Sequence, residues 1–460
     1  EISTTGASNG SINITAIGGF LSTGASYSYN WSTTNGSGLN NSSEDQSGLS
    51  AGTYTVIVTD SNNCTETKVY KLDEPDQLSF SSIISNFSGF EISCFDADDG
   101  SISITPTGGS GTYTYDWSTN NGSGLIQGQQ NQTGLGPGTY SLTITDSNGN
   151  TISQNFVIDE PTALNLSSTI SDYNNFEVSC FGGADGEIDI TVGGGTGQYT
   201  YNWSASNNGA GIVNGQQDQT GLSAGTYTVI IVDENDCEIS ESFTLNSPDQ
   251  ISIISSKSDY NGFNVSCNGS TDGTIDLNVS GGYLATGSSY SYSWSTNNGS
   301  GLSPTNKNQS GLSAGTYTVV ATDDNGCSIT QDIEIIEPNI LNIDEVISDY
   351  NGFQISEAGE NDGSINISVS GGTSNYTYVW STLDGSGLSV NSEDQNSLTA
   401  GTYSVIVTDT NGCVITEDYT LIDPKELLIS LDNDAYKNDV FCYGDSTASI
   451  KVDITQGSVA

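Results

Sequence analysis

The chain has 460 residues, with 55 acidic side chains against seven lysines, no arginine and a formal net charge of −48. This balance excludes nucleic acid and anionic lipid as partners, because both are bound through Lys and Arg side chains that neutralise phosphate. Histidine is also absent and no apolar run approaches ~20 residues, so we expect no catalytic triad, no His-containing zinc site and no direct membrane insertion.

Prolines divide the sequence into tandem repeats. Pro75, Pro161, Pro248, Pro338 and Pro424 follow one another at spacings of 86, 87, 90 and 86 residues. A fixed period of this length indicates an array of similar domains. We expect the first repeat to lack its opening strand and the last to be the truncated start of a sixth, so that the chain is an interior piece of a longer array. The predicted repeats 1 to 6 are residues 1–75, 76–161, 162–248, 249–338, 339–424 and 425–460.

Within each repeat, alternating apolar runs are separated by turn residues, and no helical period appears. Asn-Gly pairs such as Asn121-Gly122 predict hairpins, because a type I′ turn needs positive φ at both central residues. About seven short strands per repeat predict an all-β chain of immunoglobulin-like sandwiches, with strands lettered A to G, in series as an extended rod or filament. In repeat 2 the runs are LSFSSII (78–84), FEISC (90–94), SISITPT (101–107), YTYDWS (113–118), GTYSLTITD (138–146) and TISQNFVID (151–159), with the turn DADDG (96–100) before the third.

Two aromatic motifs recur in all five repeats and predict the core. The pattern YxYxW places its Trp where strand C of an immunoglobulin-like domain carries a buried Trp, and the Tyr of GLSAGTYTV and its variants stands at the start of strand F, as in a tyrosine corner. A lectin-like aromatic platform is the alternative interpretation of the triplet. The predicted core residues are Trp31, Trp117, Trp203, Trp294 and Trp380, with Tyr54, Tyr140, Tyr227, Tyr317 and Tyr403.

The combination of motifs resembles the SprB-type repeat. CNGSTDGTI (267–275) and GLSAGTYTVVATDDNGC (311–327) show the pattern most fully, together with Gly-Gly, YxYxWS and a closing Glu-Pro. That family occurs in very large cell-surface adhesins of gliding Bacteroidetes. The resemblance implies an extracellular, outer-membrane-attached filament involved in adhesion or gliding motility and delivered by type IX secretion.

Eight cysteines in such an acidic chain indicate disulfides. Each repeat has an early slot before strand B and a late slot in the F–G hairpin, and a disulfide requires both of its slots to be filled. The early slots hold Thr4, Cys94, Cys180, Cys267, Glu357 and Cys442. The late slots hold Cys64, Asn150, Cys237, Cys327 and Cys413.

Slot occupancy favours bridges between neighbouring repeats. Pairing within a repeat is consistent in two of five cases, whereas pairing an early slot with the late slot of the following repeat is consistent in four of four. In a head-to-tail string of sandwiches the A–B end of one domain also abuts the F–G end of the next. Bonding within a repeat is the alternative. The predicted bridges are Cys94–Cys237, Cys180–Cys327 and Cys267–Cys413, while Thr4 faces Asn150 without a bridge.

The same geometry gathers carboxylates near the joint between repeats 2 and 3. Calcium takes six to eight oxygen ligands, so a calcium site is one interpretation of this cluster. The other is that Asp and Asn before Gly are ordinary turn formers that bond their own backbone. The candidate ligands are Asp98, Asp99, Asp159, Glu160, Asp233 and Asp236; otherwise we expect no cofactor.

We therefore expect a structural stalk of a bacterial surface adhesin, stiffened by disulfides, and no enzyme. The expected partners are neighbouring repeats of the same chain, together with extracellular polysaccharide or other filament chains. Two alternatives remain: an array of glycan-binding repeats that acts by avidity, and a self-assembling extracellular fibre.

Overall fold

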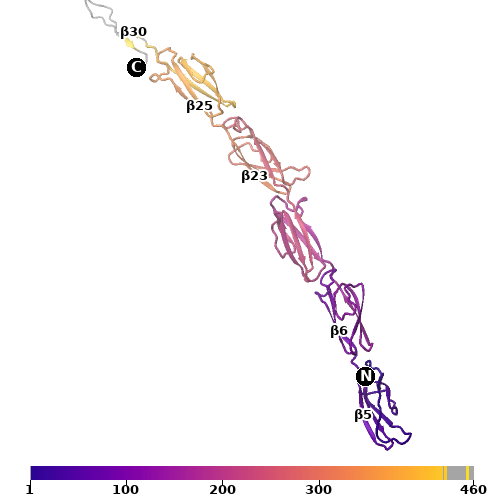
Figure 1. Cartoon of the computed structure of the whole chain (residues 1–460). Coiled ribbons are helices and arrows are strands. Elements are labelled where there is room, and N and C mark those ends of the chain that lie inside the picture. Colours follow the sequence, from indigo (N-terminus) through magenta and orange to yellow (C-terminus); the bar gives the residue numbers. More distant parts are fainter. Residues whose placement is uncertain (1, 428, 432–451, 455–460) are drawn as a thin grey trace, which may run out of the picture. The chain divides into compact units, whose positions relative to one another are not determined.

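The computed structural model describes residues 2–427, 429–431 and 452–454. Among these residues every regular element is a β-strand, and Figure 1 shows the strands gathered into a small group in each repeat. By its contacts the chain forms two units, Glu1–Ser171 with Ala184–Asn246, and Asp172–Gly183 with Ser247–Ala460. Cys442 and most of the expected sixth repeat lie outside the described residues. The described part contains no helix with the length and hydropathy needed to cross a membrane.

The first unit contains most of repeats 1 to 3, whose strands recur at matching places. Repeat 1 has β1 (Gly10–Ile12), β2 (Ser28–Thr34), β3 (Gln46–Leu49), β4 (Gly52–Thr59) and β5 (Thr65–Leu72). Repeat 2 has β6 (Ser79–Ile84), β7 (Gly100–Thr107), β8 (Thr114–Asn120), β9 (Gln132–Leu135), β10 (Gly138–Thr145) and β11 (Thr151–Ile158). Repeat 3 has β12 (Asn165–Ile170), β13 (Ala184–Gly193), β14 (Thr200–Ser206), β15 (Gln219–Ser223), β16 (Gly225–Val232) and β17 (Glu238–Leu245).

The second unit contains repeats 4 and 5 and one further strand pair. Repeat 4 has β18 (Ser252–Lys257), β19 (Gly273–Ser280), β20 (Ser291–Thr296), β21 (Gln309–Leu312), β22 (Gly315–Thr322) and β23 (Ser328–Ile335). Repeat 5 has β24 (Asn342–Ile347), β25 (Gly363–Ser370), β26 (Thr377–Thr382), β27 (Gln395–Leu398), β28 (Gly401–Thr408) and β29 (Val414–Leu421). The last pair is β30 (Ile429–Leu431) with β31 (Val452–Ile454), which are antiparallel.

Each complete repeat is a sandwich of two antiparallel three-stranded sheets. In repeat 2 one sheet has the order β6-β7-β9 and the other β8-β10-β11, and repeats 3 to 5 show the same two orders. Lettered along the chain, these sheets are A-B-E and C-F-G, which is the immunoglobulin arrangement without strand D. The fold is therefore a tandem array of immunoglobulin-like sandwiches, as the sequence predicts, with six strands in a complete repeat where about seven are expected.

The FEISC run of repeat 2 is not a strand. It lies in the loop from strand A to strand B, where the only ladder contact is an isolated bridge between Phe87 and Phe90. Ile92 in the middle of the run is fully buried. Its alternation therefore reflects one apolar anchor in a loop and no sheet pairing. This A–B loop contains the early cysteine slot, which Cys94 fills at the end of the run.

The aromatic triplet faces the core. Trp117 in β8 pairs with Leu142 in β10 and is 1% exposed, and the corresponding Trp of every other repeat is also buried. Residues two apart on a strand share a face, so Tyr113 and Tyr115 lie on the side of Trp117. Both pack against the core of repeat 2. The hydroxyl of Tyr113 donates to the carbonyl oxygen of Gly108 at 2.6 Å, so it is held by the Gly-Gly turn. The triplet is thus internal and does not form an exposed platform.

A buried glutamine stabilises the loop that replaces strand D. Gln132 in strand E is 1% exposed, and its side-chain amide accepts a hydrogen bond from Ile126 N at 2.9 Å and donates one to Ile126 O at 2.8 Å. Asn131 beside it accepts a hydrogen bond from the backbone of Ile104 in strand B. Equivalent buried glutamines are Gln46, Gln219, Gln309 and Gln395.

Candidate functional site: the joints between neighbouring repeats

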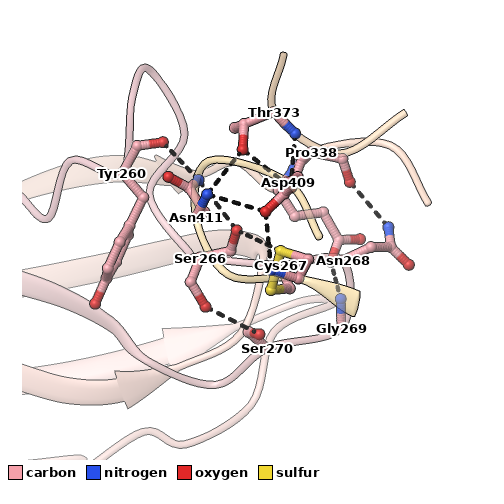
Figure 2. Close-up of a disulfide and its surroundings, with 12 residues drawn as sticks. Tyr260, Ser266, Cys267, Asn268, Gly269, Ser270, Pro338, Thr373, Asp409 and Asn411 are labelled. Carbon is pink, nitrogen blue, oxygen red and sulfur yellow. Dashed lines mark hydrogen bonds between the residues drawn. A yellow bond between two sulfur atoms is a disulfide. The ribbon is translucent and has the colours of Figure 1, made fainter. Parts of the chain in front are cut away.

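A buried aspartate shapes the F–G turn that carries the late cysteine slot. In repeat 5, one carboxylate oxygen of Asp409 accepts hydrogen bonds from the backbone N–H groups of Asn411 and Cys413, at 2.9 and 2.8 Å. The other oxygen accepts from the backbone and the hydroxyl of Thr373, at 2.8 and 2.9 Å (Figure 2). Asp409 therefore fixes the turn and attaches it to the B–C loop. Asp60, Asp146, Asp233 and Asp323 occupy the same place in the other repeats.

These hydrogen bonds favour the charged form of the Asp409 carboxyl group. Burial alone would raise the pKa of Asp409, but the N–H groups of Thr373, Cys413 and Asn411 and the Thr373 hydroxyl favour the carboxylate more strongly. The pKa of Asp409 therefore lies below its ordinary value. Asp146 in repeat 2 shows the same balance, with its pKa lowered by Asn150, Ser110 and Asn148 against the effect of burial. The turn thus holds a charged aspartate at neutral pH.

An asparagine two residues before the late slot connects each turn to the preceding repeat. The side-chain nitrogen of Asn411 in repeat 5 donates to the carbonyl oxygens of Tyr260 and Ser266 in repeat 4, at 3.1 and 3.2 Å (Figure 2). Its side-chain oxygen accepts from Asn261 Nδ2 at 2.6 Å. One side chain thus binds the A–B loop of the neighbouring repeat at three points. Asn235 and Asn325 make the equivalent bonds to Phe87 and Ser93, and to Tyr173 and Ser179.

Three disulfides join the early slot of one repeat to the late slot of the next. Their Cα–Cα distances are 5.7, 5.6 and 5.6 Å, within the usual range for a disulfide. The structure thus contains the three pairs that slot occupancy favours, and no bridge within a repeat occurs among the described residues. The pairs are Cys94–Cys237, Cys180–Cys327 and Cys267–Cys413.

The joint between repeats 1 and 2 has the same geometry without a bridge. Asn150 occupies the late slot, and its side-chain nitrogen donates to the carbonyl oxygen of Ser3 at 3.3 Å. Cys237 Sγ lies at the same distance from the equivalent carbonyl, that of Ser93. Asn148 also donates to Ser3 O, at 2.9 Å. Hydrogen bonds thus hold this joint where the others have a covalent bond.

In repeats 1, 2, 4 and 5, the acidic residue of the linker caps the A–B loop of its own repeat. Glu74, Glu160 and Glu337 each accept a backbone N–H at 2.6 Å, from Gly6, Asp96 and Gly269 respectively. Asp423 takes this role in repeat 5, accepting the N–H of Gly359 at 3.1 Å. The linker therefore runs along the loop that meets the next repeat, and its carboxylate holds that loop in place.

The candidate calcium ligands do not gather into one metal-binding group. No three His, Cys, Asp or Glu residues among those described lie close enough together to hold a metal ion. Asp98 accepts a hydrogen bond from the Ser123 hydroxyl, Asp99 accepts one from the Ser93 N–H, and Glu160 caps Asp96. Asp233 shapes its F–G turn, Asp236 sits in that turn with φ 66°, and Asp159 is exposed. Asp98, Asp99, Glu160 and Asp233 thus already accept hydrogen bonds from protein donors.

Sequence reasoning missed the asparagine of the F–G turn as a joint residue, and it named the aspartate only in repeat 3, as the calcium candidate Asp233. Their signal is the spacing Asp-x-Asn-x-slot, which recurs as DSNNC (60–64), DSNGN (146–150), DENDC (233–237), DDNGC (323–327) and DTNGC (409–413). Both residues persist in repeat 2, where the cysteine is replaced. The asparagine and the aspartate thus contribute to the joint independently of the disulfide.

Comparisons with solved structures found similarities at low sequence identity. Among solved structures, the chain is similar to the eight N-terminal Ig domains of Down syndrome cell adhesion molecule, with 13% identity over 93% of this chain and a TM-score of 0.22; it spans 59% of that chain. It is also similar to three domains of the bacteriophage RB49 capsid protein Hoc, with 15% identity, coverage of 56% and 97%, and a TM-score of 0.27. The human desmocollin-1 ectodomain gives 11% identity, coverage of 88% and 94%, and a TM-score of 0.23.

No curated protein matches the chain. The family model of the SprB repeat matches residues 91–122, 177–208, 263–299 and 358–385. Each match begins in the A–B loop and extends through strand B into the region of strand C, so it includes the early slot or its immediate surroundings and the aromatic triplet. The chain thus carries SprB repeats at four positions along its length.

Proposed function

We propose that this chain is the structural repeat region of a large bacterial cell-surface filament, acting as a disulfide-stiffened stalk in adhesion or gliding motility. The observation that carries the proposal is the bridging of three early slots to the late slots of the following repeats. At these three joints, neighbouring repeats are joined by a linker, a disulfide and an asparagine clamp. Such joints suit a protein that transmits force along its length.

The disulfides also support an extracellular location for the chain. Disulfides form and persist in oxidising compartments, so three of them in one chain favour an extracellular protein. Attachment to the outer membrane and delivery by type IX secretion follow from the family resemblance and belong to the proposal. An acidic surface with a net charge of −48 also discourages lateral association of repeated β-domains.

Electron microscopy of the unreduced chain tests the proposal. Strands of eight residues span roughly 26 Å, so with the loops at both ends each repeat should add roughly 4 nm to a single, unbranched particle. We expect measurable stiffness before reduction, and a clear fall in persistence length after a thiol reductant breaks the bridges. Laterally bundled fibres with a stiffness indifferent to reduction would contradict the stalk and support self-assembly instead.

A matched variant separates the bridges from other effects of reductant. Replacing Cys94, Cys180 and Cys267 by serine removes all three disulfides and leaves every asparagine clamp in place. The variant without reductant should resemble the reduced parent chain. If it keeps the stiffness of the unreduced parent, the disulfides do not carry the mechanical role proposed for them.

A further inference from the structure

The F–G turn of repeat 1 is built like the turns that form the joints. One carboxylate oxygen of Asp60 accepts the N–H groups of Asn62 and Cys64, both at 2.9 Å, and the other accepts that of Phe20 at 2.8 Å. Asp409 holds its own turn through the corresponding contacts. The backbone hydrogen bonds of Asp60 also keep its pKa below the ordinary value, the Phe20 N–H contributing most. The turn is thus preformed.

The asparagine and the cysteine that bind a neighbouring repeat at the other joints are exposed on this turn. Asn62 and Cys64 are both exposed, and Cys64 is a free thiol. Their counterparts in repeat 5, Asn411 and Cys413, are half-buried under the loop that they bind. Three copies of the same Asp-x-Asn-x-Cys turn in this chain are occupied, and each occupant is an A–B loop. The three occupied copies therefore indicate that the ligand of this turn is an A–B loop.

We propose that the F–G turn of repeat 1 is a docking surface for the cysteine-bearing A–B loop of another SprB repeat. The occupied joints specify what the incoming loop presents. Its backbone carbonyls one and seven residues before the cysteine receive the asparagine side chain, as Ser266 and Tyr260 do before Cys267. Asn62 takes that role here, and Cys64 forms the disulfide.

The covalent step is a thiol–disulfide exchange. The Cys64 thiolate attacks the sulfur of an A–B loop cysteine that is held as a mixed disulfide with a small thiol. The bond between Cys64 and the loop forms, the bond to the small thiol breaks, and that thiol leaves as its thiolate. No net oxidation or reduction occurs. This inference rests on the geometry of the three bridged joints. It concerns binding by repeat 1 and not the stiffness of the stalk, so the docking proposal and the stalk proposal can each fail without the other.

A synthetic peptide with the sequence of residues 86–97 provides the probe, carrying its Cys94 as a mixed disulfide with glutathione. The full chain is used with Cys442→Ser, because the three disulfides use six of the eight cysteines and Cys64 is then the single unpaired thiol. Intact-mass spectrometry measures the exchange equilibrium constant. A peptide with the same composition and cysteine position but scrambled flanking residues is the reference.

We expect the native peptide to be favoured over the scrambled one by about tenfold, which corresponds to two net hydrogen bonds. Asn62→Ala should remove most of that preference, whereas Thr65→Ala, which changes an exposed strand residue beside Cys64, should leave it intact. Peptide mapping of the three internal disulfides verifies that each variant is folded. Equal constants for the two peptides, or a preference unaffected by Asn62→Ala, would overturn the proposal.

Discussion

At the scale of single residues, the tyrosine corner is an instance in which one hydroxyl fixes a whole turn. The Tyr227 hydroxyl lies 2.8 Å from the Ala210 carbonyl oxygen and 2.7 Å from that of Ser223, and it accepts the Ala210 N–H at 3.0 Å. Tyr227 is fully buried. Removing the hydroxyl takes a hydrogen-bond donor away from the half-buried Ser223 carbonyl beside a fully buried ring, which is more costly than losing an exposed bond.

We therefore expect Tyr227→Phe to lower the opening free energy of repeat 3 by about 1–3 kcal/mol. Native-state hydrogen exchange of the amides of β15 and β16 measures this locally, without treating the whole array as one two-state unit. Tyr201→Phe is the matched control, because the half-buried Tyr201 hydroxyl contacts a single exposed partner, Gln217, at 3.0 Å. Equal effects of the two substitutions would contradict the role assigned to the corner.

The aspartates of the F–G turns predict a loss of stability in acid. The pKa of Asp409 is lowered in the folded chain, so its carboxylate stabilises the fold above the ordinary Asp value of about 4. That contribution is lost as the pH falls through the lowered folded pKa. Asp409→Asn should therefore reduce stability at neutral pH and reduce its dependence on pH in acid.

Thermal melts of parent and variant between about pH 5 and pH 2 measure this dependence. Asp418→Asn, which changes an exposed aspartate on the neighbouring strand β29, is the control and should keep the parental acid slope. A parental slope in the Asp409 variant as well would show that other carboxylates account for the acid sensitivity.

At the scale of elements, the joint between repeats 1 and 2 predicts where a fourth disulfide forms. Thr4 and Asn150 occupy the early and late slots, and Asn150 already contacts Ser3 next to Thr4. The combined substitutions Thr4→Cys and Asn150→Cys should form a bridge under oxidising conditions. Closing a loop of this length typically adds about 2–4 kcal/mol to the free energy of unfolding.

Peptide mapping under non-reducing conditions checks the new bridge, and the melting of repeats 1 and 2 checks its effect. Each single cysteine variant should gain a free thiol and no added stability. Two unbonded thiols in the double variant, while the three existing bridges stay intact, would show that this joint differs from the others in backbone geometry.

Most strands were predictable because they depend on local alternation. Strand C with its inward Trp and strand F with its corner Tyr follow from residues close in sequence. The hairpin predicted at Asn121-Gly122 does not form, because β8 before this pair is bonded to β10 and β9 after it lies in the other sheet, and only Asn121 has a positive φ. The FEISC loop was not predictable, since one buried Ile92 with polar neighbours gives the same alternation as a strand. The absent strand D was hidden as well, because Gln132 satisfies the backbone of its loop through side-chain hydrogen bonds to Ile126, six residues earlier, which no periodicity reveals.

At the joints, only the pairing of the cysteines was predictable from the sequence. Filled and empty cysteine slots can be compared without a structure, because a bridge needs both partners. The calcium interpretation depended on counting charges near the joint. Asp99 and Glu160 accept backbone N–H groups 6 and 64 residues away, Asp98 accepts the Ser123 hydroxyl, and charge counting does not show which donor a carboxylate has already taken.

At the scale of the whole molecule, the three disulfides overlap along the chain and shorten the covalent path through it. From Cys94 a path crosses to Cys237, follows the chain to Cys267 and crosses to Cys413. That path contains 267 − 237 = 30 residues, whereas the unbridged chain from Cys94 to Cys413 contains 413 − 94 = 319. Fully stretched, these lengths are roughly 10 nm and roughly 110 nm.

Pulling the full chain by its ends should therefore release about 100 nm less length before reduction than after it. Single-molecule force spectroscopy measures the difference directly, since the unbridged ends contribute equally in both states. The middle bridge, Cys180–Cys327, provides the control, because the shortest covalent path from Cys94 to Cys413 does not pass through it. Replacing Cys180 and Cys327 by serine should leave the maximum extension unchanged. Replacing Cys94 and Cys237 should lengthen the shortest path between positions 94 and 413 from 30 residues to (180 − 94) + (327 − 267) = 146, which adds roughly 40 nm to the extension. If the unreduced parent unravelled to the full length, load would pass through the linkers alone, and the joints would hold orientation without limiting extension.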